Sequence, residues 1–327
     1  MEFYTNVARY GNSILYRGYL DGKRIHRKVP FCPTLYVTDQ KGEWTTLDKQ
    51  TVSPMQFEDM KSAKEFIASY GEVENFRIYG NTNYISQFIH DNFPGQQIPF
   101  DATKINVCNI DIEVESDDGF PEPEQAKHPV TAITLKDNVR DAYFVWGMGE
   151  WSLENSEMKE QLKDHDVKYF RCNDEMHLLK SFMTYWTTPH LTPDVVTGWN
   201  VRMFDIPYLV NRMVQLFGEE FTKKLSPWKM IQQKEITVKG KRMQAYDLVG
   251  IQQMDYLDLF LKFGVQTYGK QESNRLDHIA SVIVGEKKLQ FDGNLHTLYK
   301  ENHQKFIDYN IRDVWLVDRI DNKTALM

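Results

Sequence analysis

The sequence contains little cysteine and no long apolar run, and both shortages argue against whole classes of protein. Its three cysteines, Cys32, Cys108 and Cys172, lie far apart with no C-x-x-C pair, which argues against a disulfide framework or a structural zinc site and fits a reducing compartment. No apolar segment is long enough to span a bilayer, and the first residues lack the apolar centre of a signal peptide. We therefore expect a cytoplasmic protein that does not enter a membrane.

The chain also lacks net positive charge, since its 39 lysines and arginines are outnumbered by 46 aspartates and glutamates and the formal net charge is -7. Any contact with phosphate groups has to come from local basic patches or from bound metal ions. The 327 residues suffice for two domains and a sizeable core, and 41% hydrophobic residues indicate a globular rather than a disordered chain.

The first part of the chain, residues 1–103, is predicted to be a smaller α+β domain. Asp21-Gly22 between two strand-like segments is a strong hairpin signal, and helical spacing of apolar residues follows. We expect strands at Ser13–Leu20 and Arg24–Val29, helices at Met60–Tyr70 and Tyr84–Asp91, and the domain boundary near Ile98–Thr103.

The second part, residues 104–327, alternates between strand and helix patterns, as α/β folds do. Asn173 and Ser273 are predicted helix caps, and Gly218 is a predicted helix stop. We expect strands at Lys104–Val114, Val130–Leu135, Ala142–Trp146, Val167–Cys172 and Asp194–Thr197, a hairpin of Glu235–Val238 and Arg242–Tyr246, and helices from about Asp174, at Pro207–Phe217, after Ser273 and at His303–Asp321.

The strand at Lys104–Val114, KINVCNIDIEV, ends in two acids and organises the rest of the interpretation. Side chains alternate between the faces of a strand, so Asp111 and Glu113 point the same way. The residues before them are apolar on both faces, which predicts a central strand covered on both sides. Neighbouring carboxylates repel each other unless a cation lies between them, and Mg²⁺ typically binds one or two carboxylates together with substrate phosphate oxygens.

A calcium-binding loop is an alternative for the same acids, because Asp111, Glu113, Glu115 and Glu122 occupy positions 1, 3, 5 and 12 of that pattern. Ser116 stands where the loop needs glycine, the preceding segment is strand-like, and prolines would obstruct the exiting helix. We reject the calcium loop.

Two further segments are predicted to bring acids to the same place. Asp205 follows the strand end Thr197–Asn200, and Tyr309 and Asp313 lie four residues apart on one helix face. Four acids and a tyrosine can hold two divalent ions about 3.5–4 Å apart, the spacing of two-metal phosphoryl chemistry. Tyr309 would then orient or deprotonate the attacking water by hydrogen bond, although the pKa of a phenol is too high for it to act as an unassisted base at pH 7.

Each of these residues also has a purely structural interpretation. Asp205 precedes Ile206-Pro207 and taken alone is a good helix N-cap. Asp313 alone would be a surface acid on a helix, and Tyr309 alone a core residue with its hydroxyl at the rim. Asp111 and Glu113 resist such an interpretation, because acids on a buried strand are costly without partners.

Three sequence segments resemble the exonuclease motifs of B-family DNA polymerases, in the right order: DIEV at 111–114, TGWNVRMFDIPYL at 197–209 and YNIRDV at 309–314. The segments DGFPEPEQAKHP at 118–129 and LSPWK at 225–229 are similar to those of T-even-type bacteriophage polymerases. The resemblance implies a ribonuclease H-like domain, with a mixed sheet flanked by helices, that removes nucleotides in the 3′→5′ direction.

The resemblance also implies roles for individual residues. It gives Asp111, Glu113, Asp205 and Asp313 as ligands of two Mg²⁺ or Mn²⁺ ions, Tyr309 as a residue that places the attacking water, and Lys288 as a lysine near the scissile phosphate, with Lys287 as the alternative register. DNA contacts are expected from Phe120, Asn200, Lys239 and Lys241. Phe120 could stack on an unpaired base or anchor its loop in the core, and the Lys239–Lys241 hairpin resembles one that parts primer from template but could also be an ordinary exposed hairpin.

We therefore expect a monomeric 3′→5′ exodeoxyribonuclease acting on single-stranded DNA 3′ ends or primer–template DNA in the cytoplasm of a phage host. The polymerase motifs of the family, an SLYPS-like segment and a DTD-type acid pair, are absent before Met327, so the chain is expected to be an N-terminal part that works with a polymerase domain. The alternatives are a non-catalytic nucleic-acid-binding module and a free-standing DEDD-type exonuclease acting on RNA.

Overall fold

The contacts in a computed structural model, which describes residues 1–74, 76–95, 97–115, 119–238 and 240–327, divide the chain into Met1–Asp101 and Ala102–Met327. The division falls inside the Ile98–Thr103 window expected from the sequence. No helix in the described ranges is both long and apolar enough to cross a membrane.

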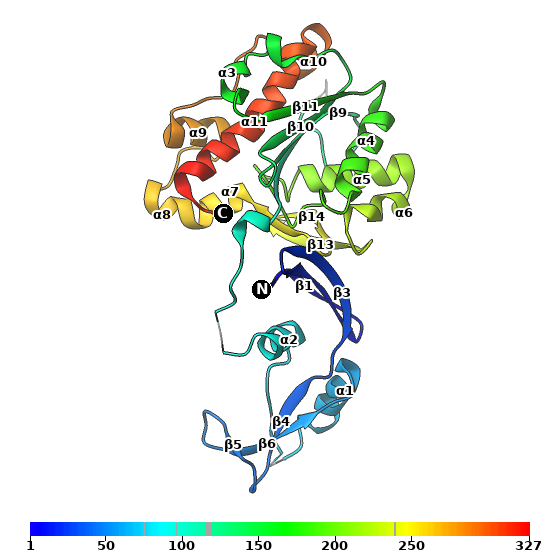
Figure 1. Ribbon diagram of the computed structural model, residues 1–327, viewed down its shortest axis with the longest axis vertical. Helices are drawn as coiled ribbons and strands as arrows, with labels where there is room; N and C mark the ends of the chain where they lie inside the picture. Colours follow the sequence, from blue (N-terminus) through cyan, green and yellow to red (C-terminus); the bar gives the residue numbers. More distant parts are fainter. Residues whose placement is uncertain (75, 96, 116–118, 239) are drawn as a thin grey trace. The chain divides into compact units, whose positions relative to one another are not determined.

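The first unit contains two antiparallel sheets with helices (Figure 1). The predicted hairpin is confirmed, and Asp21 and Gly22 both have positive φ, 50° and 74°, as its tight turn requires. One sheet has the order β1 (Glu2–Tyr10), β2 (Ser13–Leu20), β3 (Lys23–Pro30), and the other the order β5 (Trp44–Thr45), β6 (Thr51–Gln56), β4 (Thr34–Thr38), β7 (Ile78–Tyr79). The predicted helices are α1 (Met60–Tyr70) and α2 (Tyr84–Asn92).

The second unit is built on a six-stranded mixed sheet. In spatial order its strands are β11 (Asp166–Arg171), β10 (Ala142–Gly147), β9 (Val130–Asp137), β8 (Val107–Val114), β12 (Val195–Gly198) and β15 (Gln252–Asp255). β8 runs antiparallel to β9 and parallel to β12, which in turn runs parallel to β15. The expected mixed sheet is therefore confirmed, with the acidic strand in its interior.

Helices and one hairpin complete the second unit. The α-helices are α3 (Lys159–Leu162), α4 (Glu175–Thr187), α5 (Asp205–Phe217), α6 (Glu219–Thr222), α7 (Tyr256–Leu259), α8 (Val265–Tyr268), α9 (Leu276–Val284), α10 (Leu295–Glu301) and α11 (His303–Thr324). Short 3₁₀ turns are η1 (Ala102–Lys104), η2 (Leu153–Asn155) and η3 (Lys223–Leu225), and η4 (Phe260–Gly264) is a π-helical turn. The hairpin pairs β13 (Ile231–Val238) with β14 (Lys241–Leu248) and is longer than predicted.

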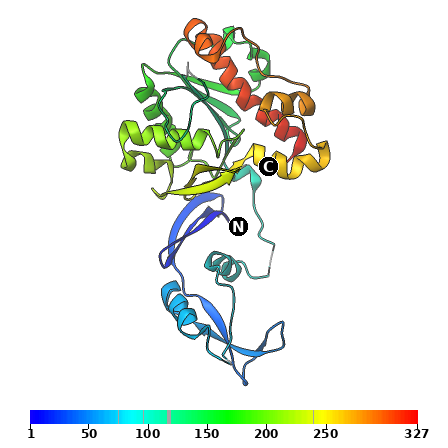
Figure 2. The ribbon, with the colours of Figure 1, turned by 180° about the vertical axis from the view of Figure 1, so that it is seen from behind.

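The sheet separates two apolar cores, one on each face, and β8 lies between them. α4 and α5 lie against one face and α11 crosses the other, as two opposite views show (Figures 1 and 2). Cys108, Ile110 and Ile112 point into the core that contains α4 and α5. Asn109 points to the other side, where its Nδ2 donates to the carbonyl of Val314 on α11 at 2.8 Å. The alternation predicted for this strand is thus confirmed, and it directs Asp111 and Glu113 toward α11.

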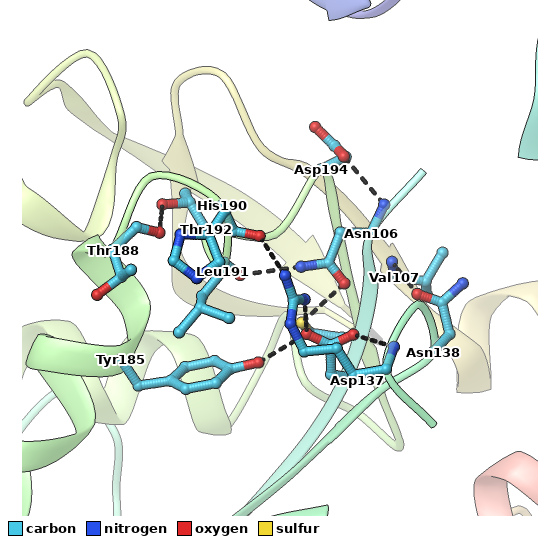
Figure 3. Close-up of polar contacts among 12 residues, drawn as sticks. Asn106, Val107, Asp137, Asn138, Tyr185, Thr188, His190, Leu191, Thr192 and Asp194 are labelled. Carbon is cyan, nitrogen blue, oxygen red and sulfur yellow. Dashed lines mark hydrogen bonds and ion pairs between the residues drawn. The ribbon is translucent and has the colours of Figure 1, made fainter. Parts of the chain in front are cut away.

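β8 starts at Val107 and not at the predicted Lys104, because hydrogen bonds to polar side chains and a loop carbonyl hold Asn106 and Val107 (Figure 3). The amide of Asn106 donates to the carboxylate of Asp194 at 2.9 Å, and its side chain donates to the carbonyl of Leu191 at 2.9 Å. The amide of Val107 donates to Asn138 at 2.7 Å. These bonds fix where the strand begins and therefore where the acids at its other end lie.

Two predicted helix caps are wrong by one or two residues. α4 is capped by Asp174 and not by Asn173, because the Asp174 carboxylate accepts from the amide of His177 at 2.8 Å. At α9 the cap position belongs to Arg275, and Ser273 instead accepts from the amide of Arg275 at 3.3 Å. The predicted stop of α5 at Gly218, which has φ of 82°, is confirmed.

Candidate active site

Three carboxylates from two elements meet on the α11 side of the sheet. The ligand oxygens of Asp111, Glu113 and Asp313 lie within 4.8 Å of one another. Asp111 and Glu113 come from alternate positions of β8, and Asp313 comes from the middle of α11, where Tyr309 lies one turn earlier on the same face. The structure therefore brings together three of the four predicted acids and the predicted tyrosine.

Lys288 is the cation that reaches into this cluster, and not Lys287. Its Nζ donates to the hydroxyl of Tyr309 at 3.0 Å, lies 5.0 Å from the centre of that ring, and forms an ion pair with Asp313. Lys287 is exposed. The lysine named from the resemblance thus lies beside the acids, while its neighbour points to solvent.

Asp205 lies next to the cluster but outside the group of three. It is the first residue of α5, and its Oδ1 accepts from the amide of Ile112 at 3.0 Å, between the two acids of β8. The structural interpretation of Asp205 as a helix N-cap is wrong, because Phe204 occupies the cap position. The carboxylate is used to join α5 to β8, and it lines the same cavity as the other acids.

Burial gives the acids unusual affinity for protons. It raises the pKa of Asp111 well above its ordinary value, and the charges of Asp313 and Glu113 add to this effect. Burial also raises the pKa of Glu113 to about 8, with Asp313 as the second cause, and the pKa of Asp205 to about 7. Ionising these carboxyl groups together is therefore costly, and a bound cation would offset that cost.

The donor set fits a divalent metal ion. Asp313 Oδ1 is buried without a hydrogen-bond partner among the described residues, which is costly unless another ligand is bound there. Clustered carboxylate oxygens are the ligands preferred by Mg²⁺ and Mn²⁺. Asp111, Glu113 and Asp313 could hold one ion, and Asp205 lies where it could take part in holding a second.

The acids form one wall of a cavity of about 710 Å³. Every predicted site residue except the hairpin lysines lines it, namely Asp111, Glu113, Phe120, Asn200, Asp205, Lys288, Tyr309 and Asp313. Phe120 is 79% exposed and its ring lies 5.1 Å from that of Phe204. The alternative that Phe120 anchors its loop in the core is therefore wrong.

The hairpin residues cannot be placed in the site. Lys239 lies outside the described residues, and for Lys241 only the backbone is described, as the first residue of β14. Nearby basic side chains on the hairpin are paired with acids, Lys234 with Asp247 and Arg242 with Glu235. In the calcium-loop alternative, Ser116 is likewise outside the described residues, but Asp111 and Glu113 lie in a paired strand and not in a loop.

Two residues that position the site were missed in the sequence. Asn310 on α11 donates to Asp111 Oδ2 at 2.7 Å. Asp255, 4% exposed, accepts from the amides of Asn200 and Arg202 at 3.0 and 2.9 Å and so shapes the turn in which Asn200 has φ of 68°. Asp255 ends β15, which runs parallel to β12, so its place at a strand end was a signal that could have revealed it.

Comparisons with known proteins point to one family. The family model for the exonuclease domain of DNA polymerase family B matches residues 44–272. The DNA-directed DNA polymerase of Escherichia phage RB69 is 34% identical over 98% of this chain and 37% of its own length. The DNA-directed DNA polymerase of Enterobacteria phage T4 is 29% identical over the same shares, and the DNA polymerase catalytic subunit of Psittacid herpesvirus 1 is 28% identical over 42% of this chain and 12% of its own. The chain thus spans about 37% of the two phage relatives.

Proposed function

Since the chain belongs to DNA polymerase family B and carries the exonuclease domain of that family, we propose that its acidic cavity hydrolyses DNA 3′ ends and releases nucleoside monophosphates. The support is the set of four acids, one lysine and one tyrosine around a single cavity. A divalent ion held by Asp111, Glu113 and Asp313 would neutralise phosphate charge and activate water, as in other phosphoryl hydrolases.

In this proposal Tyr309 holds its proton and orients the attacking water. Burial, together with the charge of Asp313, raises the pKa of the Tyr309 phenol above its usual value, so the phenol is not the base at neutral pH. Its oxygen accepts a hydrogen bond from Lys288, which leaves the hydroxyl proton to be donated to water or to a phosphate oxygen. Of the two roles expected for Tyr309, orientation is favoured over deprotonation.

The substrate proposed for this cavity is an unpaired DNA end. The exposed ring of Phe120 can stack on a base of any identity, and Asn200 lies on the cavity wall beside Trp199. The relatives are described as DNA-directed DNA polymerases, which supports DNA as the partner and proofreading beside a polymerase domain as the setting. We also propose that the chain acts in the cytoplasm of a phage host, which the phage relatives support, and that it acts as a monomer.

The observation that carries the proposal is the buried Oδ1 of Asp313, which has no hydrogen-bond partner in the described part of the chain and belongs to a group of three carboxylates within 4.8 Å. The test is a gel assay on 5′-labelled single-stranded DNA with Mg²⁺, in the presence and absence of EDTA. We expect stepwise shortening from the 3′ end that EDTA and Asp111→Asn both abolish. Glu160→Gln, on the exposed surface of α3, is the matched control and should cleave normally.

Two outcomes would overturn the proposal. Internal cuts or shortening from the 5′ end would show a different nuclease. Tight DNA binding without cleavage, with Mn²⁺ as well as Mg²⁺, would favour a binding module instead. Parallel reactions on an RNA strand of the same sequence decide between a deoxyribonuclease and the RNA-directed alternative.

A further inference from the structure

The loop that carries Lys288 is attached to the helix that carries Asp313. This loop follows α9, contains Glu286, Lys287 and Lys288, and forms no helix or strand of its own. It contacts α11, although α10 lies between the loop and α11 in the sequence. Arg312, the residue before Asp313 on α11, is buried and faces this loop. One helix therefore supplies both the acid that receives the Lys288 amine and a cation that contacts the loop just before Lys288.

Arg312 contacts the loop through two of its guanidinium nitrogens and lies against an aromatic ring. Its Nε donates to the carbonyl of Lys287 at 2.9 Å, and its NH2 donates to the carboxylate of Glu286 at 2.6 Å. The guanidinium lies 4.4 Å from the centre of the Trp315 ring. A planar group with fixed donors and an aromatic support is held in one orientation, so it can fix the peptide that it grips.

A second contact fixes the same loop from the other side. The amide of Lys288 donates to Asp277 Oδ1 on α9 at 2.8 Å. The peptide between Lys287 and Lys288 is therefore bonded through its carbonyl to α11 and through its amide to α9. Lys288 has a long flexible side chain, and without such anchors the ordering of its amine would cost side-chain and backbone entropy.

We propose that Arg312 is a positioning residue that holds Lys288 in the catalytic cavity by clamping the peptide between Lys287 and Lys288. This inference rests on the proposed exonuclease function for its kinetic consequences, but the clamp itself is a property of the chain. The Lys288 amine fixes the oxygen of Tyr309 and offsets the charge of Asp313, so a displaced loop would disturb both residues at once.

The clamp can be measured without any nuclease activity. A small amine-acylating reagent labels lysines according to their accessibility, and mass spectrometry with fragmentation separates Lys288 from the exposed Lys287 beside it, which serves as the internal reference. In Arg312→Gln we expect Lys288 to react about fivefold faster relative to Lys287, the change that follows from losing one typical hydrogen bond. Unchanged relative labelling of Lys288 in the folded variant would overturn the clamp.

Kinetics then test whether Arg312 acts through Lys288. Arg312→Gln should lower kcat about 10–100-fold with little change in KM, because a misplaced catalytic group affects the transition state more than binding. Lys288→Met should lose a similar amount, and the double variant should be no slower than Lys288→Met alone. Losses that multiply in the double variant would show that Arg312 acts independently of Lys288.

Matched variants separate the clamp from general support of α11. Arg319 also lies over Trp315, at 5.5 Å, and is exposed, so Arg319→Gln should leave both labelling and kcat unchanged. If Arg312→Gln fails to fold, Glu286→Gln removes the negative charge of one partner of the clamp at a partly exposed position and should change the labelling in the same direction by less. An effect of Arg319→Gln equal to that of Arg312→Gln, or no effect of Glu286→Gln, would contradict the proposal. If the wild-type chain shows no exonuclease activity, the labelling result still stands as the test of the clamp.

Discussion

The side-chain amide of Asn310 donates to Asp111 Oδ2 at 2.7 Å, so α11 orients the first acid of β8 as well as supplying Asp313. Asn310 is fully buried and its contact uses one of the two oxygens that Asp111 could offer to a metal ion. Groups that hydrogen-bond to metal-binding carboxylates set the orientation and the basicity of those carboxylates. The site is therefore ordered by the docking of one helix on one strand.

Removing this amide should weaken metal binding and activity together. In Asn310→Ala, Asp111 loses its donor in a buried place, and we expect about a 10–100-fold loss in metal affinity or activity. The measurement is the Mg²⁺ concentration for half-maximal cleavage, followed beside the thermal midpoint in EDTA. An unchanged Mg²⁺ requirement with a lowered midpoint would mean that Asn310 serves only the fold.

Stability without metal should fall as the pH rises. The folded chain binds protons more tightly than the unfolded chain at Glu113 and Asp205, whose pKa values are raised to about 8 and about 7 from 4.5 and 3.8. Their contribution is fully present below the unfolded values and is lost as the pH rises through the folded values, so in EDTA the free energy of unfolding should decrease between about pH 4 and about pH 8. Mg²⁺ favours the ionised acids and should reduce this loss.

Thermal midpoints across that interval, with EDTA or with Mg²⁺, check this expectation. Glu113→Gln is the matched comparison, because it removes the acid whose pKa is raised to about 8 while keeping the size of the side chain. Its midpoint in EDTA should depend less steeply on pH than that of the wild type. Equal slopes in the two proteins would rule out Glu113 as a source of the pH dependence.

Two substitutions of Asp205 should separate its structural role from its proposed catalytic role. Asp205→Asn keeps an oxygen that can accept from the amide of Ile112, whereas Asp205→Ala leaves that amide without a partner. We expect Asn to leave the free energy of unfolding near the wild-type value and Ala to lower it by about 1–3 kcal/mol. Both should lose cleavage. Denaturant unfolding and the gel assay measure the two effects, and full cleavage by Asp205→Asn would remove Asp205 from the catalytic set.

Phe120 should contribute to DNA binding and not to stability. Its side chain is 79% exposed, so Phe120→Ala should leave the thermal midpoint nearly unchanged. Loss of base stacking should weaken binding of single-stranded DNA by about 1–3 kcal/mol. Fluorescence anisotropy with labelled oligonucleotides measures this change, and Phe263→Ala, 45% exposed away from the cavity lining, is the control. Equal affinities for Phe120→Ala and wild type would exclude stacking.

The parts of the fold that follow from local patterns were predictable from the sequence. The hairpin at Asp21-Gly22, the helix at Met60–Tyr70 and the stop at Gly218 depend on backbone geometry within a few residues. The caps of α4 and α9 were misplaced because several adjacent polar residues can each cap a helix, and tertiary contacts choose among them.

The residues of the candidate site likewise fall into those that local patterns predict and those that depend on tertiary contacts. Alternation along β8 puts Asp111 and Glu113 on one face of the strand, and the four-residue spacing puts Tyr309 and Asp313 on one face of α11, so both pairs were predictable locally. Asn310 and Arg312 were missed because their roles depend on which loop and strand lie against α11. Asp205, predicted as a metal ligand, resembles a helix cap when taken alone because it precedes Ile206-Pro207. Its bond to Ile112 joins residues 93 positions apart, so no local pattern indicates it.

The contacts between β8 and α11 also set when the site can exist during synthesis. Asp111 and Asn310 are 199 residues apart, and the bond between Asn109 and Val314 spans 205. A ribosome adding about 5–20 residues per second needs on the order of 10–40 seconds to make that stretch. Throughout this time the nascent chain carries the acids of β8 without the helix that completes the site. The carboxylates of β8 therefore cannot be completed into the candidate site until α11 has left the ribosome and docked on the sheet.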